Sequence, residues 1–155
     1  QDWHLISKAR LVYMINMANT YSRKNILLVE DNRSFRESLK KLLQKEGFQI
    51  LEAESGVDGM ELLKKERIDL VILDYYLGGM NGLQFLEKTK NPDRPPVIIL
   101  TAFGDWGIYS EVVARGAKDC LLKPVKRKEL MAVVEAALAD TNRNDGESRG
   151  EKAAS

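Results

Sequence analysis

Four short apolar runs, each ending at a polar position, constrain the fold of this 155-residue chain most strongly. The runs end at Glu30-Asp31, Asp74, Thr101 and Lys123. Short Ile, Leu and Val runs are typical of parallel strands buried on both faces, and an open α/β sheet keeps its chemistry at the carboxyl ends of its strands. If the runs are neighbouring strands, three carboxylates, a hydroxyl and an ammonium group meet at one edge of the sheet.

This combination of groups predicts a particular kind of pocket. A carboxylate that attacks a phosphoryl group must overcome charge repulsion, and three carboxylates together increase that repulsion. Mg²⁺ prefers oxygen ligands and offsets negative charge on phosphoryl oxygens. The residues therefore predict a divalent cation beside a carboxylate nucleophile, in a pocket that steadies a small anion.

Between its ends the chain alternates regularly between two kinds of segment. Strands are expected at residues 26–29, 48–53, 70–73, 97–100 and 120–122, and helices from the Asn32 cap to Gly47 and at 56–66, 82–90, 105–115 and 126–139. In the second helix, Val57, Met60 and Leu63 are the expected inward positions. Five strands alternating with five helices predict an α/β fold with a parallel sheet covered on both faces.

The two ends of the chain follow other patterns. Residues 1–24 are expected to form an N-terminal helical extension, amphipathic because Leu11, Met14, Ala18 and Tyr21 follow helical spacing. It is the tail of an upstream module, a self-association helix or artificially added sequence. Residues 140–155 lack apolar periodicity and are expected to be a flexible linker or tail.

Composition narrows the class of protein. Hydrophobic residues make up 44% of the chain, and 24 basic against 23 acidic residues leave a net charge of +1. This predicts a globular chain with no direct nucleic-acid binding, which needs a concentrated basic excess. No apolar run is long enough to span a membrane, and no secretory signal is visible. Cys120 is the only cysteine, which excludes an internal disulfide and favours a cytoplasmic location. Because the first residue is Gln1, we expect a processed or excised chain.

Residues 25–139 resemble the receiver domain of two-component response regulators. The resemblance is carried by four motifs in order: Ile26–Asn32, Asp69–Asp74, Ile98–Ala102 and Leu121–Pro124. It implies a flavodoxin-like doubly wound sheet with strand order 2-1-3-4-5.

The resemblance also implies roles for the residues at the metal. Asp74 would be the phosphorylated nucleophile and a Mg²⁺ ligand. Asp31 would bind the metal directly, Glu30 would lie beside it or act through water, and Tyr76 would offer its backbone carbonyl.

Two further residues are expected to bind the phosphoryl group and take part in switching. Lys123 would pair with one phosphoryl oxygen, and Thr101 would donate a hydrogen bond to another. The resemblance further suggests a cis peptide bond between Lys123 and Pro124.

The chain departs from the family at several positions. Gly78-Gly79 stands where a Pro is usual, which predicts a looser loop. Cys120 stands where a Tyr or Phe usually reports the movement of Thr101, so we expect altered switching and smaller changes over the 101–122 surface. The phosphoryl-flanking residues Tyr76 and Phe103 cannot orient a hydrolytic water, which predicts a long-lived phosphoryl-aspartate.

The expected function is that of a phospho-acceptor switch and not of an enzyme. A sensor histidine kinase or phosphotransfer protein would donate to Asp74, and the fourth helix, fifth strand and fifth helix would bind an unknown output domain or target, with a homodimer possible. The alternative is a pseudo-receiver that docks partners without phosphorylation. A dehalogenase-type phosphatase is disfavoured because Tyr76 replaces its second Asp, and a flavodoxin because the first strand ends in Glu30-Asp31 instead of a hydroxyl-rich loop.

Overall fold

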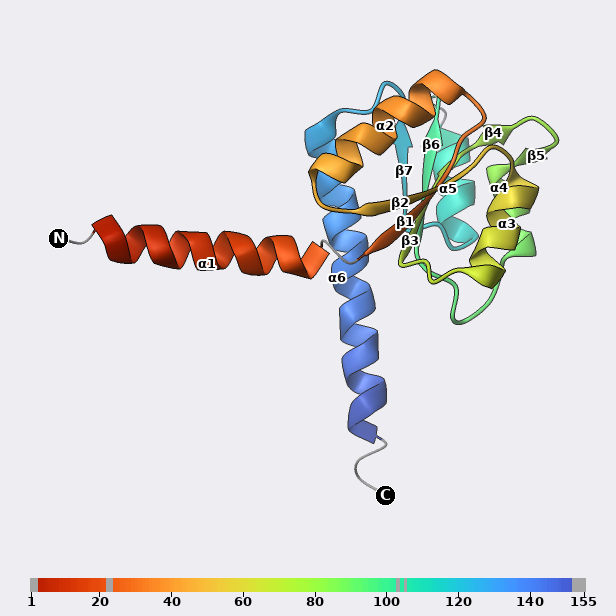
Figure 1. The fold of residues 1–155 in the computed structure, drawn as a ribbon. Helices are drawn as coiled ribbons and strands as arrows, with labels where there is room; N and C mark the ends of the chain where they lie inside the picture. The colour runs from red at the N-terminus through yellow and green to blue at the C-terminus, as the bar shows by residue number, and fades with distance from the viewer. Residues whose placement is uncertain (1–2, 22–23, 103, 105, 152–155) are drawn as a thin grey trace.

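The computed structural model describes residues 3–21, 24–102, 104 and 106–151, in which helices surround a central sheet (Figure 1). In chain order the elements are α1 (Trp3–Tyr21), β1 (Asn25–Val29), α2 (Arg33–Lys45), β2 (Gln49–Ala53), α3 (Gly56–Lys65), β3 (Leu70–Asp74), β4 (Tyr76–Leu77), β5 (Met80–Asn81), α4 (Gly82–Lys88), β6 (Val97–Thr101), α5 (Trp106–Ala114), β7 (Asp119–Leu122) and α6 (Arg127–Glu151).

The central sheet has five parallel strands in the order β2-β1-β3-β6-β7. Since β6 and β7 are its fourth and fifth strands along the chain, the expected order 2-1-3-4-5 is confirmed. Such an order places β1 and β3 in the middle of the sheet, where both faces must be covered.

Alternate residues of the strands enter two separate cores. On β1, Ile26 and Leu28 belong to a cluster that contains residues of α2 and α6, whereas Leu27 and Val29 belong to one that contains residues of α4 and α5. All four side chains are essentially inaccessible to solvent. Burial of both alternating sets explains why the strand appears in the sequence as a continuous apolar run.

Polar side chains cap the first turns of α2, α3 and α4. The Asn32 side chain accepts a hydrogen bond from the Phe35 N–H at the start of α2, and Ser55 caps α3 in the same way. Asn81 and Gln84 form a capping box on α4. The predicted end of the first of these helices at Gly47 is confirmed, because Gly47 adopts a φ of 96° just after α2.

The inward face of α3 differs from the expectation at Val57. That side chain is 56% exposed, while Met60 and Leu63 are partly buried as predicted. Gly59 is buried instead, and a Cβ added there would lie 2.9 Å from Val29 Cγ2. A glycine therefore permits the close approach of helix and sheet, and this role is invisible to a search for apolar spacing.

The loop after β3 contains a small hairpin that the sequence did not suggest. Tyr76 pairs with Asn81 and Leu77 with Met80, in antiparallel register. Gly78 supplies the positive φ of 65° in its turn. The double glycine thus has a defined place in a tight turn, and the flexibility of the loop stays a prediction.

The terminal helices also differ in part from the expectations. The predicted N-terminal helix is present as α1, which extends away from the sheet (Figure 1). Its amphipathic character was wrong: five consecutive apolar residues, Leu11–Ile15, are all about half exposed or more. The last helix was expected to end at Ala139 but continues to Glu151. Among the described residues, none of the helices combines the length and apolar character needed to cross a membrane.

Candidate functional site

The predicted polar residues meet at the carboxyl edge of the sheet. The strand register aligns Val29 with Leu73, and Asp74 with Leu100. Backbone hydrogen bonds continue this alignment past the strand ends, since the Lys123 N–H donates to the Thr101 carbonyl at 2.7 Å. The parallel ladder therefore places the first residues after β1 and β7 beside the last residues of β3 and β6.

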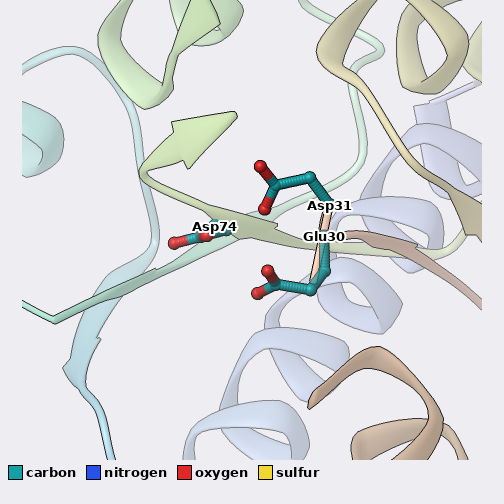
Figure 2. Close-up of side chains that lie close together, drawn as sticks. All are labelled: Glu30, Asp31 and Asp74. Carbon is teal, nitrogen blue, oxygen red and sulfur yellow. The ribbon is translucent and has the colours of Figure 1, made fainter. Parts of the chain in front are cut away.

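Three carboxylates lie together at this edge. Oxygen atoms of Glu30, Asp31 and Asp74 are all within 4.8 Å of one another. Figure 2 shows the three side chains with their carboxylates directed toward a common space. Glu30 and Asp74 are buried, and Asp31 is exposed. One side of this acidic group is therefore open to solvent through Asp31.

Glu30 is the most buried member of the acidic group, with 1% of its surface exposed. Its carboxylate accepts hydrogen bonds from the Asn32 N–H at 3.0 Å and from Lys123 Nζ at 2.9 Å. Burial raises the pKa of Glu30 above its ordinary value, and these two hydrogen bonds act in the opposite direction. The local environment thus makes a positive charge near Glu30 favourable.

Lys123 supplies positive charge to two of the carboxylates. Its Nζ atom lies 2.9 Å from Glu30 Oε2 and 3.3 Å from Asp74 Oδ2. The peptide bond between Lys123 and Pro124 is cis, as the resemblance suggested. In this geometry a small anion attached to Asp74 would find an ammonium group within reach.

Arg36 is a residue of the site that the sequence analysis missed. It is buried, and its Nη1 donates to the Glu30 carbonyl at 2.7 Å. Its guanidinium also contacts Glu52 and Glu54, at 3.3 and 3.1 Å. It therefore fixes the backbone that carries Glu30. The sequence does contain one indication of this role: Arg36 lies three residues before Leu39, which places a charged residue beside the apolar face of α2.

Phe35, in the first turn of α2, is a second residue of the site that the sequence analysis missed. The structure places Lys123 Nζ 4.2 Å from the centre of the Phe35 ring. No rule of residue spacing pairs a residue of α2 with one that follows β7. Only the fold reveals this contact, which lies at the edge of the acidic site.

The remaining predicted positions surround this group or lie outside the described part of the chain. Thr101 is buried at the end of β6. Tyr76 is half exposed, and its ring makes an edge contact with Tyr75 at 4.8 Å between centroids. Whether its carbonyl binds a metal stays a prediction. Phe103 falls outside the described residues.

Cys120 lies half-buried in β7, where it packs against the core shared by β1, β3 and α4. Burial raises the pKa of its thiol to about 11, so the sulfur is protonated near neutral pH. A hollow of about 170 Å³ lies beside it, lined also by Thr101, Trp106 and Tyr109. Cys120 is therefore a small packing residue that leaves space next to Thr101.

Comparison with known proteins connects this geometry to one family. A family model described as the response regulator receiver domain matches residues 26–135. The chain is 34% identical over 116 residues to sporulation initiation phosphotransferase F of Bacillus subtilis, which covers 74% of this chain and 94% of that protein.

It is also 34% identical over 124 residues to the transcriptional regulatory protein AfsQ1 of Streptomyces coelicolor, covering 80% of this chain and 55% of that protein. The chain thus spans about half the length of AfsQ1 and of the DNA-binding response regulator MtrA of Mycobacterium tuberculosis.

Solved structures agree with these matches. The crystal structure of a response regulator receiver domain protein from Clostridium thermocellum superposes with a TM-score of 0.72 at 28% identity, over 77% of this chain and 97% of that one. The acidic group at the carboxyl edge of the sheet is consistent with the phospho-acceptor site of receiver domains. The sheet order and the family match lead to one conclusion: the chain belongs to the response regulator receiver domain family of two-component signalling.

Proposed function

We propose that Asp74 accepts a phosphoryl group from the phosphohistidine of a sensor kinase or phosphotransfer protein, with Mg²⁺ bound in the acidic pocket. The observation that supports this most is the convergence of Glu30, Asp31 and Asp74 within 4.8 Å, with Lys123 Nζ 3.3 Å from Asp74 Oδ2. Three acidic side chains and one ammonium in this arrangement suit both a hard cation and a phosphoryl group.

The donor set of the pocket fits Mg²⁺. All three side chains offer carboxylate oxygens, which Mg²⁺ prefers, and the exposed Asp31 leaves room for the waters that this ion keeps. Asp31 and Asp74 would bind the ion, with Glu30 beside it or acting through water and the Tyr76 carbonyl as a further ligand. When bound, the ion supplies positive charge that offsets the developing charge on the phosphoryl oxygens.

Asp74 carries the chemical step. One of its carboxylate oxygens attacks the phosphorus atom of the phosphohistidine, and an O–P bond forms as the P–N bond breaks. The electron pair of the broken bond stays on the imidazole nitrogen of the donor. The product is an aspartyl phosphate, and Asp74 needs no proton transfer because it reacts as the carboxylate.

Lys123 and Thr101 would recognise the product. The ammonium of Lys123 pairs with one phosphoryl oxygen, and the Thr101 hydroxyl donates a hydrogen bond to another. Lys123 already lies beside Asp74, whereas Thr101 is buried at the end of the adjacent strand β6. Movement of Thr101 toward the phosphoryl group would change the surface formed by α5 and β7 beside it, the α5–β7 surface. We propose that this surface, together with α6, binds an output domain or target.

Direct phosphorylation of the 155-residue chain tests this function. With a small phosphoryl donor such as acetyl phosphate and with Mg²⁺, we expect a mass increase of one phosphoryl group, abolished by EDTA or by Asp74→Asn. Asp69→Asn is a matched control, because Asp69 lies before β3, at the opposite end of that strand from Asp74. Absence of label from the wild-type chain would favour the alternative, a docking module that acts without phosphorylation.

The location and the wider system follow from this proposal. A donor histidine kinase acts on its receiver where both can meet, and we propose the cytoplasm as that place. We propose that the switch acts on an output domain or on a separate target protein.

A further inference from the structure

Lys123 has a third neighbour besides the two carboxylates. Its Nζ atom lies 4.2 Å from the centre of the Phe35 ring, within the range of a cation–π contact. The Lys123 side chain is only 21% exposed, so this contact forms in a largely desolvated position. Ammonium groups are attracted to aromatic faces most strongly where water is excluded.

Phe35 is itself held in place from two directions. Its backbone N–H donates to the Asn32 side chain at 3.0 Å, in the cap that begins α2. Its ring is partly buried and packs against the core cluster that contains Leu39 and Leu43. The ring is therefore a fixed surface at the edge of the acidic pocket, whereas a lysine side chain has many rotamers to restrict.

The chemistry of the ring suits this position better than another anion would. A further carboxylate beside Lys123 would also attract the ammonium, but it would add to the repulsion between Asp74 and an incoming phosphoryl group. An aromatic face attracts the cation without a net negative charge.

We propose that Phe35 is a positioning residue, whose ring holds the Lys123 ammonium beside Asp74 so that it is in place when a phosphoryl oxygen arrives. The expected effect of Phe35 on phosphoryl binding rests on the proposed function, whereas the Phe35–Lys123 contact does not. A purely structural role for Phe35 would make its loss equivalent to the loss of any other ring in the same core.

The contact can be measured directly by NMR on the full chain. A methylene group held over an aromatic face is shifted upfield by the ring current, so the Lys123 ε-methylene protons are expected upfield of their position in urea. Phe35→Leu should abolish this shift and Phe35→Tyr should retain it. Phe48→Leu is the matched control, because Phe48 is buried in the same core cluster but follows the other end of α2.

The function of the contact is measured by titration with beryllofluoride, a phosphoryl mimic, in the presence of Mg²⁺. Phe35→Leu should weaken binding about fivefold, the scale expected for loss of one cation–π contact, while Phe35→Tyr restores most of the affinity. Phe48→Leu should leave the affinity within about twofold of the wild type, whatever its effect on stability.

Each outcome decides the proposal. It is overturned if the wild-type ε-methylene protons show no upfield shift, or if Phe35→Leu and Phe48→Leu weaken beryllofluoride binding equally. If Phe35→Leu does not fold, the wild-type shift relative to urea and the affinity of Phe35→Tyr decide between the contact and simple packing. Failure of the wild-type chain to bind beryllofluoride, with the ring-current shift present, would refute the phospho-acceptor function and confine Phe35 to holding Lys123.

Discussion

The acidic pocket and the α5–β7 surface are neighbours at the same edge of the sheet, but they are built differently. In the pocket, Glu30 and Lys123 are held by several short polar contacts, and Arg36 fixes the backbone behind them. On the α5–β7 surface, Trp106 is 77% exposed, Leu122 is 49% exposed, and a hollow lies beside Cys120.

The pocket where we propose phosphorylation occurs is thus packed differently from the surface that would transmit the signal. The groups that we propose bind and receive the phosphoryl group match the family expectation, whereas the position that normally reports the change in the family holds a small thiol. A receiver can therefore keep its reactive pocket while the surface that transmits the signal changes its packing. Since Thr101 borders both regions, it is the residue at which the two can be tested against each other.

Removal of the Lys123 ammonium from the pocket should have the largest effect on stability. Lys123→Met leaves Glu30 and Asp74 without their ammonium partner, and we expect a loss of about 2–3 kcal/mol in unfolding free energy at pH 7 without Mg²⁺, because unpaired buried charges are costly. On the adjacent open surface, Leu122→Ser should change stability by less than about 0.5 kcal/mol. Urea denaturation measures both.

The same pair of variants should differ in pH dependence. Burial raises the pKa of Glu30 above its ordinary value of 4.5, so its ionisation costs stability as the pH rises above 4.5. Without Lys123 this cost grows, and the deficit of Lys123→Met should shrink as the pH falls from 7 toward 4.5, where Glu30 becomes protonated in both the folded and the unfolded chain. Equal losses in Lys123→Met and Leu122→Ser at all pH values would remove the contrast between the two regions.

The reactivity of Cys120 should be the next largest effect. With a thiol pKa of about 11, its alkylation by iodoacetamide at pH 8 should be about 100-fold slower than in the urea-unfolded chain, where the ordinary value is 9.0. The rate should keep rising as the pH approaches 11. Rapid alkylation of the folded chain at pH 8 would show a reactive thiolate and contradict the packing role.

The lifetime of the phosphoryl group tests Phe103, one of the two residues that the family resemblance places beside the phosphoryl group. Phe103→Glu would add a carboxylate that can orient water, and we expect hydrolysis of the aspartyl phosphate to become about tenfold faster. The measurement is the loss of the phosphorylated mass after removal of the donor. Fast loss from the wild-type chain, unchanged in Phe103→Glu, would contradict the expectation of a long-lived phosphoryl-aspartate.

Filling the hollow beside Cys120 should have the smallest effect on stability. We expect Cys120→Phe to cost less than about 1.5 kcal/mol, because the ring enters existing space. It should also extend the chemical-shift changes caused by beryllofluoride across residues 101–122. If the wild-type chain already shows large changes throughout this surface, its switching is not altered by Cys120.

The sequence predicted the sheet and the charged pocket because both depend on local patterns. The run Leu70–Leu73 followed by Asp74 indicates a buried strand and a polar end, and the parallel order brings such ends together. Gly59 was missed because its contribution is the absence of a side chain, which lets Val29 approach. The contacts of Arg36 with Glu30 and of Phe35 with Lys123 were missed because they depend on how α2 packs over the strand ends.

At the two ends of the chain, apolar spacing predicted the helices less accurately than it did around the sheet. The spacing of Leu11 and Met14 suggested one apolar face on α1, but their neighbours are apolar and exposed as well. The absence of apolar periodicity after Ala139 suggested the end of a helix, yet α6 continues to Glu151. Apolar periodicity identifies helices that pack against a core and is a poor guide to helices that extend beyond it.

Identification of the phosphorylated side chain tests the central claim most directly. After incubation with a small phosphoryl donor and Mg²⁺, borohydride reduces an aspartyl phosphate to homoserine, and peptide mass spectrometry locates the modified position. We predict homoserine at position 74 alone and none when Mg²⁺ is chelated. Modification at another carboxylate, or labelling of position 74 that does not depend on a divalent cation, would contradict the account.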